Sequence, residues 1–247
     1  MKKILAISLF VILKGSLFFF ISMQLFSNCI LAKDSVNTIN FINYPKEIPK
    51  WELISYLGLS VAYLPKIIVE EELNQSPLIE ANFRFGLPYN FDLNARISSI
   101  YITNQFMLGL QWCHSIDKFA FSLGFNYSYW LGQFKQPAFN VIANGTMNYP
   151  FISLGYDFDD FYVSLKTEAI ISTFEETFIG ETTTGGIQRE FIGWIFSYSL
   201  EQPLFKKMQI FQSIRINLTK FYYQSWIAFT KTKNYIIFPE FVIGFKL

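Results

Sequence analysis

The sequence has few of the residues that mark metal sites and disulfide frameworks. Its 247 residues include two cysteines, Cys29 and Cys113, and a single histidine, His114. Cys29 lies in an N-terminal stretch with the character of an export signal, and one remaining cysteine makes no intramolecular disulfide. There is no Cys-x-x-Cys pair and no Cys/His cluster. The sequence therefore predicts no zinc site, no other metal and no cofactor.

Net charge and long apolar runs are also missing. The formal net charge is +1 at pH 7, so no strong field argues for a nucleic acid or another polyelectrolyte as a partner. After residue 33, no stretch approaches the roughly 18 consecutive apolar residues of a transmembrane helix. Charged residues make up 16% of the chain, which is too many for a bundle of lipid-embedded helices.

Aromatic residues, in contrast, are abundant. They form 19% of the chain, with 29 phenylalanines, and 51% of all residues are hydrophobic. The mean hydropathy is +0.27. A chain of this length is expected to form one domain, and its aromatic content is high for a soluble one.

The first 32 residues have the pattern of a secretory signal peptide. A basic start is followed by the apolar stretch GSLFFFISMQLF (15–26), and the small residue Ala32 indicates cleavage before Lys33. An uncleaved membrane anchor is the alternative interpretation of this segment.

Beyond residue 50, apolar residues recur at every second position. In FAFSLGFNYSYW (119–130), large aromatic and aliphatic residues alternate with Ala, Ser, Gly and Asn. Because successive strand residues point to opposite faces, one face of this strand is aromatic and the other is small and polar. The same pattern predicts strands near 51–64, 77–87, 91–103, 105–115, 119–130, 147–157, 161–172, 189–201, 208–222 and 234–247.

The expected connections alternate in length. Short turns rich in Pro, Asn, Asp and Lys occupy 87–91, 115–118, 157–160 and 202–207, and longer polar connections occupy 65–76, 131–146, 173–188 and 223–233. Short turns at one end and long loops at the other predict an all-β fold, a transmembrane up-and-down antiparallel β-barrel of about ten strands, with about eight or twelve as alternatives. The expected organisation is a signal peptide at 1–32, a short periplasmic N-terminal lead or partial plug at 33–50, and the barrel at 51–247.

The position of the charges distinguishes a membrane barrel from a soluble, lipocalin-like one. A soluble barrel turns its charges outward, whereas Lys or Arg facing lipid at the midplane costs about 2–4 kcal/mol. The strand charges here fall on the face opposite the aromatic one: Glu52, Glu80, Arg84, Asp92, Arg96, Lys166, Glu168, Glu201, Arg215, Glu240 and Lys246. We expect these residues, Lys246 aside, to form an ion-pair network that fills the lumen, because unpaired buried charges are very unfavourable.

Aromatic residues are also expected at both ends of the strands, as the two girdles of a spanning barrel. Those near the short turns are Trp51, Trp112, Phe158, Phe161 and Phe205. Those near the long loops are Tyr63, Tyr101, Tyr129, Trp130, Tyr222, Tyr223 and Trp226.

The last strand, PEFVIGFKL (239–247), carries large apolar residues at every second position: Phe241, Ile243, Phe245 and Leu247. It resembles the recognition signal by which Gram-negative outer-membrane β-barrels are handed to the barrel-assembly machinery, although Leu247 replaces the commoner terminal Phe. The resemblance is to a class of bacterial proteins and to no individual family. It implies export to the outer membrane, with outer-membrane lipid and the assembly machinery as partners, and we expect a monomer.

The sequence favours a role without catalysis. A barrel of about ten strands has a narrow lumen filled largely by side chains, so we predict a closed structural or surface-interaction protein. A narrow channel or transporter for a small solute is the alternative, and a lipid-modifying enzyme is less favoured. His114 and Ser115 are adjacent, and neighbours on a strand point to opposite faces, so we predict no catalytic residue.

Overall fold

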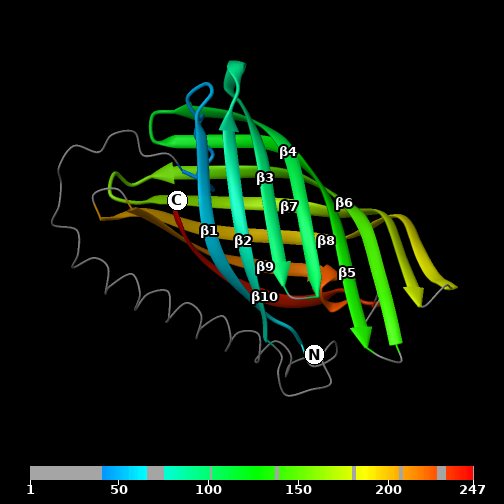
Figure 1. Ribbon diagram of the computed structural model, residues 1–247. Helices are drawn as coiled ribbons and strands as arrows, with labels where there is room; N and C mark the ends of the chain where they lie inside the picture. The colour runs from blue at the N-terminus through cyan, green and yellow to red at the C-terminus, as the bar shows by residue number, and fades with distance from the viewer. Residues whose placement is uncertain are drawn as a thin grey trace.

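The computed structural model describes residues 41–65, 75–100, 102–136, 139–179, 182–205, 208–226 and 232–246. Ten strands form one closed antiparallel barrel, in which each strand pairs with its neighbours in sequence and β1 pairs with β10 (Figure 1). The strands are β1 (Leu53–Tyr63), β2 (Gln75–Gly86), β3 (Phe91–Ile100), β4 (Thr103–Ile116), β5 (Phe119–Gln136), β6 (Phe139–Asp157), β7 (Tyr162–Ile179), β8 (Thr182–Phe205), β9 (Met208–Thr219) and β10 (Ile236–Lys246). The predicted architecture is confirmed.

Two short 3₁₀ turns interrupt the pattern of strands. One is η1 (Pro88–Asn90), between β2 and β3, and the other is η2 (Tyr223–Ser225), between β9 and β10. In the part of the chain that the structure describes, no helix has the length and apolar character needed to cross a bilayer.

The barrel closes where β1 meets β10. Leu57 pairs with Phe245, Val61 pairs with Phe241, and Gly58 lies opposite Gly244. A Cβ atom at Gly244 would lie only 2.2 Å from the ring of Phe211. The absence of a side chain on the inner face of this seam therefore makes room for a buried aromatic ring.

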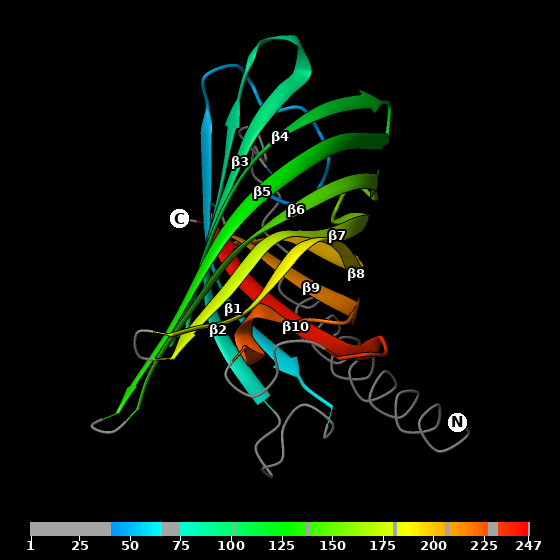
Figure 2. The same ribbon diagram turned by 90° about the vertical axis from the view of Figure 1, so that its right-hand side faces the viewer.

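β5, β6, β7 and β8 are much longer than the sequence indicated, at 18, 19, 18 and 24 residues, and the long loops predicted at 131–146 and 173–188 are wrong. Gln133 pairs with Ile142 across the β5–β6 hairpin, and Glu175 pairs with Ile187 across the β7–β8 hairpin. The β5–β6 hairpin projects well beyond the neighbouring strands (Figure 2). The polar composition of these segments is compatible with paired strands because, beyond the apolar wall, both faces of a hairpin can meet water.

The distribution of side chains is inverted relative to that of a soluble protein. Apolar residues such as Leu59 and Leu165 point outward and are more than half exposed, whereas Glu80, Asp92 and Glu201 are buried inside. A one-residue slip in a strand would turn its inward charges into the surrounding medium. Since the exposed wall is apolar and the interior charged, this is a transmembrane barrel of the outer-membrane type and not a lipocalin-like soluble barrel.

The short-turn end of the barrel is filled by the segment that precedes β1. Phe41, Ile42, Tyr44 and Ile48 are all buried. They belong to two apolar clusters that include strand residues near this end: Ile54, Tyr56, Ala120, Tyr162, Phe211 and Val242. We call residues 41–48 the plug segment. The predicted signal peptide lies outside the described residues, as does the first part of the 33–50 lead.

The opposite end is filled by residues 221–226, which connect β9 to the rest of the loop and are all buried. They pack with Trp130, Met147, Tyr149 and Ile170 in the largest apolar cluster. The predicted girdle positions of Trp130, Tyr222, Tyr223 and Trp226 are therefore wrong, because these four side chains face the interior. Two glycines make room for the indoles, since a Cβ at Gly132 would lie 2.2 Å from Trp226 and one at Gly145 would lie 2.7 Å from Trp130.

Candidate functional site

The interior of the barrel carries the polar chemistry of the molecule, and its centre is an ion triad. Arg215 on β9 donates to both carboxylate oxygens of Glu80 on β2, at 2.6 and 2.9 Å. The same guanidinium contacts Glu240 Oε1 on β10 at 3.1 Å, and the Ser60 hydroxyl donates to that oxygen at 2.8 Å. Two-point pairing of arginine with a carboxylate is among the stronger and most directional of ion pairs. The triad thus links three strands across the closing seam.

A second ion pair lies on a single strand. Lys166 Nζ on β7 lies 2.8 Å from Glu168 Oε1, and the two side chains share a face because they are two residues apart. The ammonium group of Lys166 also lies 3.9 Å from the centre of the Phe151 ring. The lysine is therefore held both by a carboxylate and by the face of an aromatic ring.

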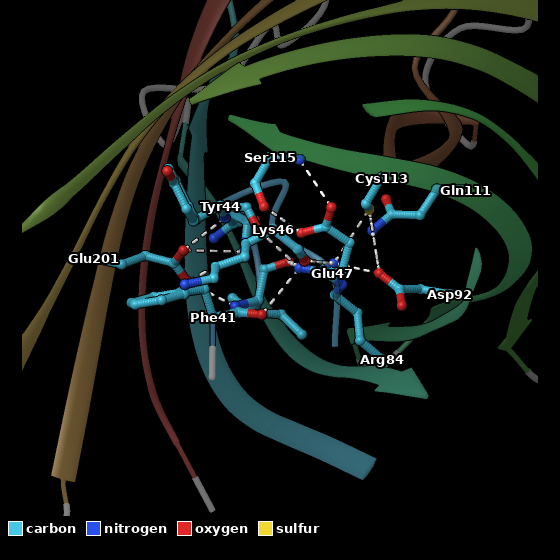
Figure 3. Close-up of polar contacts among 12 residues, drawn as sticks. Phe41, Tyr44, Lys46, Glu47, Arg84, Asp92, Gln111, Cys113, Ser115 and Glu201 are labelled. Atoms are coloured by element: carbon cyan, nitrogen blue, oxygen red, sulfur yellow. Dashed lines mark hydrogen bonds and ion pairs between the residues drawn. The ribbon is translucent and has the colours of Figure 1, made fainter. Parts of the chain in front are cut away.

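Arg84 on β2 is the main support of the plug segment. Its guanidinium pairs with Asp92 at 2.5 Å, and Asp92 also accepts hydrogen bonds from Gln111 and Cys113 at 3.2 Å. Arg84 also donates to four backbone carbonyl groups, those of residues 41, 42, 44 and 46, at 2.9 to 3.3 Å (Figure 3). One buried cation therefore organises a turn of backbone that has no strand partner.

Glu201 on β8 holds the amide groups of the same segment, whereas Arg84 holds its carbonyl groups. Its carboxylate accepts hydrogen bonds from the amides of Ile42 at 2.9 Å, Asn43 at 3.1 Å and Tyr44 at 2.7 Å. Successive amides that converge on one anion form a nest, a common way for backbone to hold a negative charge. Figure 3 shows Glu201 and Arg84 on opposite sides of the segment. Arg84 and Glu201 contact backbone atoms of the plug segment. Because every residue has these atoms, the sequence of the segment gives little indication of the contacts.

Two further contacts fix the plug segment at the rim. Glu47 accepts hydrogen bonds from the backbone amide of Ser115 at 2.8 Å and from its hydroxyl at 2.5 Å. Burial alone would raise the pKa of Glu47, but these hydrogen bonds outweigh it and lower the pKa below its usual value. The Tyr44 hydroxyl donates to the Lys118 carbonyl at 3.1 Å, and burial raises the pKa of Tyr44.

Two members of the predicted network do not behave like the rest. Arg96 on β3 has no ion pair with any described residue, and its one hydrogen bond to a side chain is the long contact of Nη2 with Gln105 Oε1 at 3.4 Å. The placement of Glu52 in the lumen was wrong. This residue is exposed and lies just before β1 at the rim, because β1 begins one residue later.

The C-terminal positions with the assembly pattern lie on β10 beside β1. Phe241 contacts the ring of Tyr63 at 5.8 Å, and Ile243 and Phe245 are exposed on the outer wall. Leu247 lies outside the described residues. Recognition of these side chains by an assembly machinery stays a prediction.

Among the described residues, small cavities lie between the plug segment and residues 221–226, and two of them adjoin the charged side chains. The larger cavity has a volume of about 90 Å³, and serine and asparagine side chains form much of its wall. The smaller cavity, of about 40 Å³, lies among Glu80, Glu240, Tyr222 and Tyr223. Neither has room for a sugar or a peptide, since one water molecule already takes about 30 Å³ of liquid volume.

His114 and Ser115 do not form the hydrogen bond of a base and a nucleophile. The imidazole of His114 stacks on Trp112 at 5.7 Å with an interplanar angle of 2°. The Ser115 hydroxyl donates to Glu47 instead. Among the described residues, no group of three or more His, Cys, Asp or Glu side chains could hold a metal ion.

No family model and no curated protein matches this sequence. Among solved structures, the fold is similar to the KdgM porin in complex with disordered oligogalacturonate, at 12% identity and a TM-score of 0.40, over 79% of this chain and 98% of that one. It is also similar to Neisserial surface protein A, at 11% identity and a TM-score of 0.37, over 79% and 96% of the two chains. A third similar structure is the outer membrane phospholipase A from Escherichia coli, at 10% identity and a TM-score of 0.34, over 78% and 92%. These scores are too low to carry over a role, and the fold assignment rests on this chain's own strand pairing and side-chain distribution.

Proposed function

We propose that the protein is a closed β-barrel of the bacterial outer membrane that acts as a structural or surface-interaction protein and does not conduct solutes. The observation that carries this proposal is the double hold of Arg84 and Glu201 on the plug segment. The plug segment is one of three barriers along the lumen. The other two are the Glu80–Arg215–Glu240 triad and the buried residues 221–226. A solute would have to displace all three.

The apolar outer surface of the barrel supports a location in the outer membrane. An exposed belt of Leu, Ile, Phe and Tyr side chains is costly in water and favourable in hydrocarbon. Antiparallel barrels with an even number of strands are the β-structures of bacterial outer membranes. Outer-membrane lipid is then the main partner, the assembly machinery acts during biogenesis, and β1–β10 closure leaves a monomer without free edges.

The surface role is supported by the two long hairpins. The β5–β6 hairpin extends past its neighbours (Figure 2). The β7–β8 hairpin continues beyond Gly193, where the pairing of β8 with β9 ends. Near the tip of the first, Gln133, Lys135 and Asn140 are exposed. Paired strands are more rigid than loops of equal length, so these hairpins offer a preformed surface outside the lipid.

Conductance in planar bilayers tests the proposal. We expect the purified, folded protein to insert without steady current steps, and its folded state to be verified by faster migration on a denaturing gel before boiling. Steady pores of the wild-type protein would contradict a closed barrel and would support a narrow channel instead.

The channel is the second candidate because both interior cavities are lined by polar groups. Displacement of the plug segment would connect the larger cavity to the periplasmic side. We propose that the protein has no enzymatic activity. Mass spectrometry of outer-membrane lipids incubated with the protein tests that point, and removal or transfer of an acyl chain would contradict it.

A further inference from the structure

We propose that the larger cavity is a binding site for one small oxyanion of the size and charge of inorganic phosphate, with Arg96 as its main charge partner. The proposal concerns an ion held inside the barrel. It does not depend on whether the lumen conducts, so it can fail without affecting the proposed function.

The wall of the larger cavity is mostly cationic. Four cationic side chains line the larger cavity, Arg84, Arg96, Lys166 and Arg215, against a single carboxylate, Glu168. Arg96, Arg215 and Glu168 line both cavities, and the smaller one adds the acids Glu80 and Glu240. Among the described residues, the larger cavity is therefore the more cationic of the two, and an anion belongs there.

Arg96 differs from the other cations of this wall because it forms no ion pair with a described residue. Arg84 is paired with Asp92, Lys166 with Glu168, and Arg215 with Glu80. Arg96 has no such partner among the described residues, and its Nε is buried without a hydrogen bond. Glu80 and Glu168 attract Arg96 only from beyond ion-pair distance. A small anion in the adjoining cavity would give this partly buried cation a partner in direct contact.

Several buried polar atoms around the same cavity have no hydrogen-bond partner within the described protein. The donors are Asn43 Nδ2, Arg84 Nε, Arg96 Nε and Ser153 Oγ. Two acceptors on the same wall, Asn94 Oδ1 and Asn126 Oδ1, are also unpartnered, and water beside the anion can satisfy them. An oxyanion with several acceptor oxygens satisfies such donors together, whereas a monatomic anion meets fewer of them. The volume of about 90 Å³ fits a small oxyanion with water and excludes an oligosaccharide.

Equilibrium dialysis of radiolabelled inorganic phosphate against the folded, full-length protein in detergent tests the site. Chloride holds the ionic strength constant. We expect one saturable site per barrel. Loss of a charged hydrogen-bond partner in Arg96→Gln should weaken binding at least about tenfold. Arg189→Gln, which removes an exposed cation on β8, is the matched control and should bind as the wild type does.

A second variant keeps the test valid if Arg96→Gln does not fold. Gln105→Glu converts the neutral oxygen that lies 3.4 Å from Arg96 Nη2 into a carboxylate, with almost no change in shape. It supplies Arg96 with a permanent partner, so we expect the variant to fold, as judged by gel migration before boiling, and to lose phosphate binding. Absence of saturable binding by the wild type, unchanged binding by Gln105→Glu, or an equal loss in Arg189→Gln would each overturn the proposal.

Discussion

The carboxylate of Glu201 accepts a hydrogen bond from the backbone amide of Tyr44 at 2.7 Å, although the two residues are 157 positions apart in the sequence. With the amides of Ile42 and Asn43 at the same carboxylate, this contact joins the segment before the first strand to the eighth strand. It is the most direct structural reason to regard the short-turn end as closed.

The first prediction concerns this contact. Glu201→Gln replaces a charged acceptor of three amides by a neutral group with one acceptor oxygen. Because hydrogen bonds to charged groups contribute about 1.5–3 kcal/mol, the plug segment should be released more often. Because the triad and residues 221–226 still block the lumen, we expect the variant to stay silent in planar bilayers but to be cleaved faster than the wild type by limited proteolysis within residues 41–48. Glu52→Gln, which changes an exposed acid near the same end, should be cleaved as slowly as the wild type, and equal cleavage of the two variants would contradict the role of Glu201.

The second prediction concerns the central triad. Arg215→Met leaves Glu80 and Glu240 buried without their cation, and removal of one partner from a buried pair costs about 3–5 kcal/mol. We expect the midpoint of unfolding in urea, followed by tryptophan fluorescence, to fall markedly. Further change of both acids, in Arg215→Met/Glu80→Gln/Glu240→Gln, should recover much of the loss. A single variant as stable as the wild type would show that water or a counter-ion already compensates the charges.

The third prediction is a pH dependence at the rim. The folded pKa of Glu47 is lowered by its hydrogen bonds to Ser115, from an unfolded value of about 4.3. The contact therefore stabilises the folded state above that pH, and the contribution disappears as the pH falls through the folded pKa.

Thermal unfolding of the wild type and of Glu47→Gln checks this dependence. The wild type should be the more stable protein at pH 7, and the difference in Tm should shrink as the pH is lowered below about 4. A difference that stays constant over this range would mean that the side chain acts through packing rather than through its charge.

The fourth prediction concerns the closing seam. Gly244→Ala places a Cβ atom 2.2 Å from the Phe211 ring, and overpacking of this kind costs about 1–3 kcal/mol. Gly58→Ala is a milder change, since its nearest contacts are at 3.0 and 3.3 Å. We expect slower refolding and a lower Tm for Gly244→Ala, relieved when Phe211→Leu is added. Equal effects of the two alanine variants would contradict the steric explanation.

The period-two alternation was enough to predict the barrel, the approximate number of strands and the side of the wall on which most charges lie. The reason is physical, because an apolar exterior fixes the register of each strand and the charges have only the interior left. Glu80, Arg215 and Glu240 could be placed inside in this way, although their mutual contacts could not be derived, because pairing across the lumen depends on strand tilt.

The missed features share a different cause. The polar hairpins beyond the membrane lack the aromatic face that marks the other strands, so residues 131–146 resemble a loop. Trp130 lies inside because it alternates in step with Ser128 on the inner face of β5, and Gly145 on the neighbouring strand gives its ring space. The alternation alone could have placed it there, although the space for its ring could not be derived from one strand. The plug segment is held through its backbone carbonyls and amides, which every sequence possesses. The two cavities required the assembled barrel.

The anchoring of the plug segment also has a consequence for biogenesis. Residues 41–48 are synthesised before any strand of the barrel, yet they are held by Arg84 from β2 and Glu201 from β8. The barrel itself closes only when β10 pairs with β1. The plug segment can therefore reach its final position only after β2 and β8 have formed. Until β2 and β8 are both in place, residues 41–48 lack these partners, and an intermediate of folding that lacks β8 should therefore have an unplugged interior.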